Sequence, residues 1–247
     1  MKNTMWNKII LVLVLIAVVG LPFTILAFGS DVGTRSSALY PYQSLIEVQD
    51  DFLAGIASSG SVGSLGWNST GSVISAASTG NNPGQYLLQT TAAISTVARI
   101  NFHTSNIYAP ALNHQITWIV KLNNNDANTT LRLGAQNSVG ADPPNDGIYF
   151  EKLDADTNWF CVTRSGGVQT RTDSGIAVTT SFVTFQFTRN SSGVMWKIDS
   201  GAVCGTHTTN ITTTLLSPIV FIINSAAANK TVNVDYFQMI LNSLSRP

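Results

Sequence analysis

Three oxygen-bearing side chains recur at every second position in one polar segment, a spacing that can bind a cation. Asp154, Asp156 and Asn158 offer two carboxylates and one amide oxygen, which are ligand types of the opening positions of a calcium loop. The rest of such a loop is missing, because Trp159 stands where it needs glycine and Ser165 where it needs glutamate. The same residues suit a tight hairpin turn, which we favour over a weak calcium site. We expect no other cofactor.

Acidic and nucleophilic groups that would support hydrolysis are few in this chain. Glycoside hydrolases use two carboxylates that flank the scissile bond, but the only glutamates are Glu47 and Glu151. Glu151 and Asp154 have an odd spacing, so a strand would place them on opposite faces. The histidines are scattered, and no Gly-x-Ser-x-Gly nucleophile motif is present. We therefore predict a protein that is not an enzyme, and we assign no catalytic residue.

Aromatic residues next to polar loops are the candidates for sugar binding. A sugar site needs a ring face for stacking and planar amide or carboxylate groups for hydrogen bonds. Tyr108 and Trp159 adjoin polar loops, so we predict them to be the ligand-binding residues of an exposed platform. Trp118 and Trp196 alternate with aliphatic residues and are predicted to lie in the core.

The chain has two cysteines, Cys161 and Cys204. A pair of cysteines can persist as a disulfide in an oxidising compartment. The alternative is two separate buried thiols, because residues distant in sequence need not meet in space. We predict the disulfide.

From residue 46 onward, short apolar runs of strand length alternate with turn-forming clusters, and no segment has a helical period. Residues 184–189 alternate polar and apolar side chains, as a strand with one solvent-exposed face does. The sequence therefore predicts an all-β, two-sheet antiparallel jelly-roll sandwich. Its predicted strands are 49–53, 73–75, 85–89, 98–103, 115–122, 129–135, 147–153, 159–164, 183–189, 194–199, 202–206, 219–223 and 231–241.

Residues 1–29 have the pattern of an export segment. Two lysines precede an uninterrupted apolar run over residues 9–21, and Gly29 provides a small residue for signal peptidase cleavage. The alternative is an uncleaved anchor helix, because the apolar stretch nearly reaches the roughly 20 residues that span a bilayer. Both readings place the bulk of the chain outside. We predict a secreted or membrane-tethered extracellular protein with a linker at 30–45 and one domain at 46–247.

Several short motifs are typical of one fold family. Near the C-terminus, Ile198-Asp199-Ser200-Gly201 is followed by Val234-Asp235-Tyr236-Phe237, while Asp50-Asp51-Phe52 lies near the start of the predicted domain. These motifs resemble a hairpin, the closing strand and the opening strand of concanavalin A-like lectin/glucanase jelly rolls. Gly147-Ile148-Tyr149-Phe150 with Asn158-Trp159 is also similar to jelly-roll domains of phage fibre and head-decoration proteins. The resemblance implies a fold and specifies no chemistry.

Charge limits the classes of partner. Only 11% of residues are charged and the formal net charge is zero, so no basic face is available for nucleic acid. We predict a non-catalytic adhesion module that recognises a carbohydrate or other cell-surface ligand. The alternatives are a structural or display protein that forms homo-oligomers and a polysaccharide-active hydrolase or lyase. Contact with a membrane is expected only through the N-terminal segment, and only if that segment stays uncleaved.

Overall fold

The computed structural model describes residues 46–52, 61–76, 84–102, 106, 108–110, 113–125, 127–138, 140 and 142–242. These residues form strands, turns and loops. Within them no helix is long and apolar enough to cross a membrane. The predicted export segment (1–29) and linker (30–45) lie outside the described residues, so both stay predictions.

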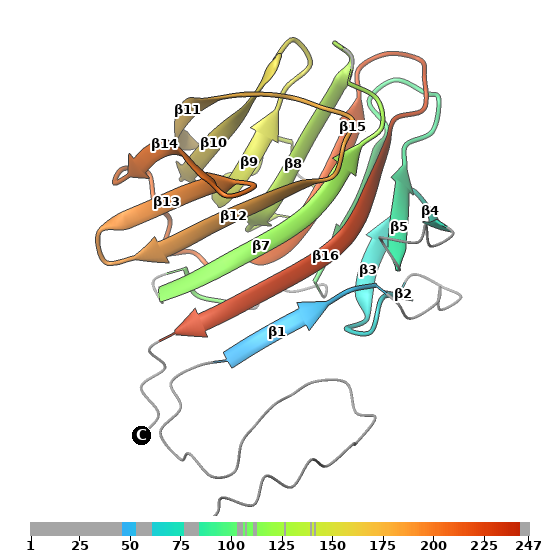
Figure 1. Cartoon of the computed structure of the whole chain (residues 1–247). Coiled ribbons are helices and arrows are strands. Elements are labelled where there is room, and N and C mark those ends of the chain that lie inside the picture. Colours follow the sequence, from blue (N-terminus) through green and yellow to red (C-terminus); the bar gives the residue numbers. More distant parts are fainter. Residues whose placement is uncertain are drawn as a thin grey trace, which may run out of the picture. The chain divides into compact units, whose positions relative to one another are not determined.

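The first sheet contains the first and the last strand of the described chain (Figure 1). β1 (Ile46–Asp50) pairs antiparallel with β16 (Thr231–Asn242), as the motifs of an opening and a closing strand predict. The hydrogen-bonded order of the sheet is β14 (Gly201–His207), β13 (Gly193–Ile198), β12 (Val183–Asn190), β7 (Asn113–Leu122), β16, β5 (Gln85–Gln89) and β4 (Ser72–Ala76).

The second sheet lies behind the first in Figure 1 and is also antiparallel. Its order is β11 (Val168–Ala177), β10 (Asn158–Ser165), β9 (Gly147–Lys152), β8 (Thr129–Gln136), β15 (Ser217–Asn224), β6 (Val97–Asn101), β3 (Trp67–Thr70) and β2 (Ser61–Val62). The predicted all-β, two-sheet antiparallel sandwich is confirmed.

The core forms where the apolar faces of the two sheets meet. In β12, Phe185 and Phe187 are buried, whereas Gln186 between them is partly exposed, because successive side chains of a strand point to opposite faces. Trp118 and Trp196 are both 1% exposed, which confirms their predicted place in the core. Trp67 packs against Trp118 with ring centroids 5.4 Å apart. Burying side chains of this size stabilises the fold by about 2–3 kcal/mol each.

A buried aspartate ties the start of the domain to the opposite sheet. Asp50, at the end of β1, is 2% exposed. Its Oδ2 accepts hydrogen bonds from Trp67 Nε1 of β3 and from the Leu65 amide, both at 3.0 Å. Its Oδ1 accepts one from the Phe52 amide at 2.8 Å. Because these donors satisfy the buried carboxylate, it can remain in the core without a cation beside it.

Candidate functional site

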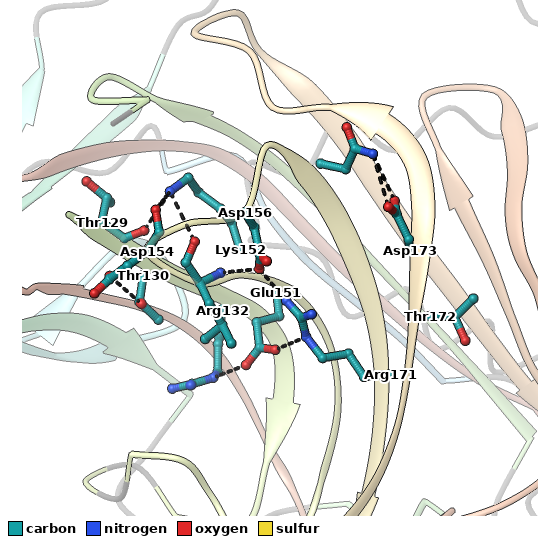
Figure 2. Close-up of polar contacts among 12 residues, drawn as sticks. Thr129, Thr130, Arg132, Glu151, Lys152, Asp154, Asp156, Arg171, Thr172 and Asp173 are labelled. Carbon is teal, nitrogen blue, oxygen red and sulfur yellow. Dashed lines mark hydrogen bonds and ion pairs between the residues drawn. The ribbon is translucent and has the colours of Figure 1, made fainter. Parts of the chain in front are cut away.

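Glu151 lies between two arginines on the outer face of the second sheet (Figure 2). Its Oε1 accepts a hydrogen bond from Arg132 Nε at 2.8 Å, and its Oε2 accepts one from Arg171 Nε at 2.7 Å. Arg132 also pairs with Asp142, and Arg171 with Asp156. Burial disfavours the charge of Arg132, but the fields of Glu151 and Asp142 raise its pKa overall. Both oxygens of the glutamate are therefore engaged in a structural ion-pair network.

The candidate calcium residues lie in and beside the turn between β9 and β10, and they bind different partners. Asp154 Oδ1 accepts a hydrogen bond from Thr130 Oγ1 at 3.0 Å. Asp156 Oδ2 accepts from the Leu153 amide and pairs with Arg171 (Figure 2).

Asn158 Nδ2 donates to both carboxylate oxygens of Asp173 at 3.1 Å. Among the described residues, no group of three or more histidines, cysteines, aspartates or glutamates is placed to hold a metal ion. The guanidinium group of Arg171, which pairs with Asp156, would also repel a cation bound at this carboxylate. The segment is the hairpin turn of the alternative interpretation, and its contacts give no support to a calcium site.

The prediction that Tyr108 and Trp159 form an exposed platform is wrong, because both side chains are buried. Tyr108 is 3% exposed and Trp159 is 1% exposed. Trp159 packs against Phe185 with ring centroids 4.7 Å apart, and Tyr108 packs against His114 at 4.9 Å. Burial raises the pKa of the Tyr108 hydroxyl. Polar neighbours in sequence indicated a nearby loop, but the rings themselves point into the sandwich and offer no face for stacking.

The two cysteines form the predicted disulfide, which joins the two sheets. Cys161 of β10 and Cys204 of β14 have sulfur atoms 2.09 Å apart. His207 of β14 lies close by, with Nδ1 3.2 Å from Thr163 Oγ1 and Nε2 3.0 Å from Thr172 Oγ1. Burial lowers the pKa of His207, so the neutral imidazole is favoured between these hydroxyls. The edge strand β14 is thus fixed to β10 and β11.

An open groove of about 700 Å³ lies on the outer face of the first sheet, at the end formed by β12, β13 and β14; we call it the sheet groove. Its floor consists of two rows of residues that pair in register across the strands. One row is Gln115, Thr188, Met195 and Thr206; the other contains Gln186, Lys197 and Ala202. Because sheet register fixes both rows, their side chains start from rigid backbone positions.

A bulge in β14 borders the sheet groove on one side. Met195 pairs with Thr206 and Trp196 with Val203, so the two intervening residues of β14, Cys204 and Gly205, have no partner on β13. Both have left-handed backbone angles, with φ of 58° and 63°, and both line the groove. β14 here lies beside β11 (Figure 1). The disulfide at Cys204 therefore holds the bulge, and with it one border of the groove, in place.

Amides and hydroxyls dominate the polar chemistry of the sheet groove. Gln186 Nε2 donates to Thr117 Oγ1 at 3.3 Å, and Thr188 Oγ1 donates to the amide oxygen of Gln115 at 3.5 Å. These contacts leave Gln186 Oε1 and Gln115 Nε2 without a hydrogen-bond partner in the described part of the chain. No carboxylate lines the groove as described. It can therefore bind a polar ligand through hydrogen bonds, but it lacks the acid pair that glycoside hydrolysis uses.

The groove residues were not identified as a site from the sequence, because they are spread over the five strands β7 and β11 to β14, and β7 is distant in sequence from the other four. The sequence contains one indication of the site. Polar and apolar side chains alternate over residues 184–189, which predicts a solvent-exposed strand face that carries Gln186 and Thr188. That pattern identifies two of the floor residues. Their neighbours are defined only by the order and register of β7, β13 and β14.

Solved structures with the same fold include proteins of different activity. One is the protein of unknown function SO2946 from Shewanella oneidensis MR-1, with a TM-score of 0.64, 16% identity and coverage of 83% of this chain and 90% of that one. Another is the Emp47p carbohydrate recognition domain, with a TM-score of 0.55, 9% identity and coverage of 80% and 95%. A third is the Crh5 transglycosylase, at 0.54, 14% identity, 80% and 85%. At these identities the likeness establishes the fold alone.

Sequence comparison adds a family match. The sequence model described as "SO2946-like, C-terminal domain" matches residues 68–239. A search of curated proteins finds no match. One structural neighbour, the Emp47p domain, is a carbohydrate recognition domain, in agreement with the predicted lectin-like fold. The resemblance to phage jelly rolls stays a prediction.

Proposed function

The chain belongs to the SO2946-like C-terminal domain family, whose match covers most of the sandwich, and we propose that it is a non-catalytic glycan-binding module that acts through the sheet groove. The observation that carries the proposal is the groove floor, where two glutamine amides and two threonine hydroxyls lie on rigid strands. A sugar presents several hydroxyls at fixed spacing, and amide and hydroxyl groups are suited to hydrogen-bond them. Rigid placement lowers the entropic cost of ordering these groups on binding.

The structural neighbours support a carbohydrate ligand but leave the choice between binding and catalysis open, since they include a carbohydrate recognition domain and a transglycosylase. We propose binding without catalysis because of the placement of the two glutamates. Glu151 has both oxygens bonded to arginines. Glu47 lies on β1 of the other sheet, where its Oε1 accepts a hydrogen bond from Gln238. The two cannot act as a pair across one bond.

The proposed place of action is outside the cell. The export pattern of residues 1–29 predicts translocation, and the Cys161–Cys204 disulfide is a kind of bond that persists in oxidising compartments. Both observations favour a secreted or membrane-tethered module.

A glycan array tests the proposal with the full chain and two variants. We expect selective binding that falls by about 30-fold in the Gln115→Ala/Gln186→Ala double variant, because two hydrogen bonds of about 1 kcal/mol each are lost. Gln238→Ala is the matched control, since Gln238 is a glutamine on the same sheet but outside the groove lining. The control should bind as the unmodified chain does.

Two results would overturn the proposal. One is the absence of binding to every glycan by a chain whose thermal unfolding shows that it is folded. The other is selective binding that the double variant and the Gln238→Ala control retain equally, because the ligand would then lie elsewhere on the molecule.

A further inference from the structure

One residue among those that line the sheet groove carries a charge, and it is Lys197. It stands in the second floor row, where β13 pairs it with Gln186 of β12 on one side and with Ala202 of β14 on the other. Its side chain is exposed. The ammonium group is therefore presented at the groove beside an amide, with a small methyl side chain opposite.

This ammonium forms no ion pair with an acidic group in the described part of the chain. The ion pairs of that part involve Arg132 and Arg171 on the other sheet, and none involves Lys197. Asp199 is the acid nearest along the strand, but its Oδ1 accepts a hydrogen bond from the Thr184 amide. The groove lining therefore carries one positively charged side chain and no carboxylate.

Resting on the proposed function, we propose that the sheet groove selects acidic glycans, and that the anionic group of the sugar pairs with Lys197. The anion receives a charge-assisted hydrogen bond from the ammonium. Neutral hydroxyls of the same sugar bond to Gln186 Oε1 and Gln115 Nε2, which have no partner in the described protein. Met195, which is 41% exposed in the other row, offers an apolar contact to the face of the sugar ring.

The size of the effect follows from the exposure of the site. A charge-assisted hydrogen bond in an open groove is worth about a tenfold difference in affinity between a charged and a neutral ligand. Screening by salt weakens an exposed charge pair, because the Debye length shrinks from about 10 Å at 0.1 M to about 3 Å at 1 M. The preference for acidic sugars should therefore fall as ionic strength rises, whereas binding of neutral sugars should change little.

The experiment compares acidic glycans with neutral counterparts of the same backbone. Oligogalacturonate and its methyl ester differ in the carboxylate charge, and sulfated and desulfated galactan oligosaccharides differ in the sulfate. Affinities are measured on the full chain in 0.05 M and 0.5 M sodium chloride. The variants are Lys197→Met, which removes the charge, Lys197→Arg, which keeps it, and Lys121→Met. Lys121 is a lysine on the same sheet, near the Phe182 ring and outside the groove lining.

The expected result is an acidic preference of about tenfold in one of the two pairs. Lys197→Met should abolish that preference, and both Lys197→Arg and Lys121→Met should keep it. The pair that shows the preference identifies the anion as carboxylate or sulfate.

Equal binding of acidic and neutral members, sensitive to Gln115→Ala/Gln186→Ala, would overturn the acidic specificity and leave the glycan-binding function intact. An acidic preference that survives in Lys197→Met would also overturn it. If neither these glycans nor an array member binds at all, the glycan-binding function itself fails, and the acidic specificity fails with it. Thermal unfolding of each variant confirms that an exposed substitution has not altered the fold.

Discussion

The Glu151 carboxylate accepts hydrogen bonds from two arginines, Arg132 of β8 and Arg171 of β11. A glycosidase carboxylate must instead leave an oxygen free to reach the substrate. Here the carboxylate neutralises two cations on a sheet face where Glu151 is 2% exposed. The carboxylate therefore contributes to the cohesion of β8, β9 and β11.

Replacing Glu151 with alanine should lower the free energy of unfolding by about 3–5 kcal/mol. The substitution removes the partner of two cations, and the buried Arg132 would keep only Asp142. Urea unfolding monitored by tryptophan fluorescence measures the change. Glu47→Ala is the control, because Glu47 is exposed and bonded only to Gln238 in the described chain, and it should cost less than about 1 kcal/mol. Equal losses in the two variants would refute the network's structural role.

The elements differ in how well the sequence predicts them. Strands that contribute to the core, such as β12 and β15, have apolar runs or clean alternation and lie where predicted. β11 was missed, because it is an edge strand whose residues are mostly exposed and polar. Its pairing with β10 comes from the hairpin turn at Gly166-Gly167, which hydrophobic periodicity cannot reveal. The short strands β2 and β3 were missed for a related reason, since they offer little apolar sequence.

Close approach between β8 and β9 depends on a glycine. Gly134 has φ of 150°, and a Cβ there would lie 2.5 Å from the Ile148 carbonyl oxygen and 2.6 Å from Tyr149 Cα. Both obstacles are backbone atoms of the paired strand, so they cannot move aside without breaking the pairing. We expect Gly134→Ala to lower the free energy of unfolding by about 2–3 kcal/mol, measured by thermal and urea unfolding.

Gly166→Ala is the matched control for that change. Gly166 also has a positive φ, of 55°, but nothing lies within 4 Å of the position of its Cβ. Its substitution should cost only the backbone strain, about 1 kcal/mol. A loss at Gly134 no larger than that at Gly166 would show that β8 and β9 can separate without penalty.

At the scale of the whole molecule, the sequence predicts the sandwich but not the position of the candidate site. The alternation of polar and apolar residues identifies the solvent-exposed face of a strand, and the presence of two cysteines predicts the disulfide. The sheet groove requires the pairing of β12 with the distant strand β7 and a register shift between β13 and β14, and hydrophobic alternation reveals neither of them. Tyr108 and Trp159 were misplaced because a polar neighbourhood in sequence does not report the direction of a side chain.

The two sheets are covalently joined once in the described chain, by Cys161–Cys204. The bond closes a loop with a sequence separation of 43 residues. Its removal should lower the free energy of unfolding by about 4 kcal/mol, because the unfolded chain gains conformational entropy when the loop is opened. The double variant Cys161→Ser/Cys204→Ser, followed by urea unfolding, tests this. Amide exchange in β14 should also accelerate more than in β7, because the bulge loses its tether. Unchanged stability would mean that His207 and its threonine partners hold β14 without the bond.

The pairing of β1 with β16 also determines how the domain responds to mechanical load. Ile46 is in register with Leu241, and Asp50 with Phe237, so both ends of the domain leave the sheet at the same end of one strand pair. Tension applied between those ends would peel the pair apart one hydrogen bond at a time, beginning at Ile46, which resists little force. The domain is therefore mechanically weak when it is pulled by its two ends.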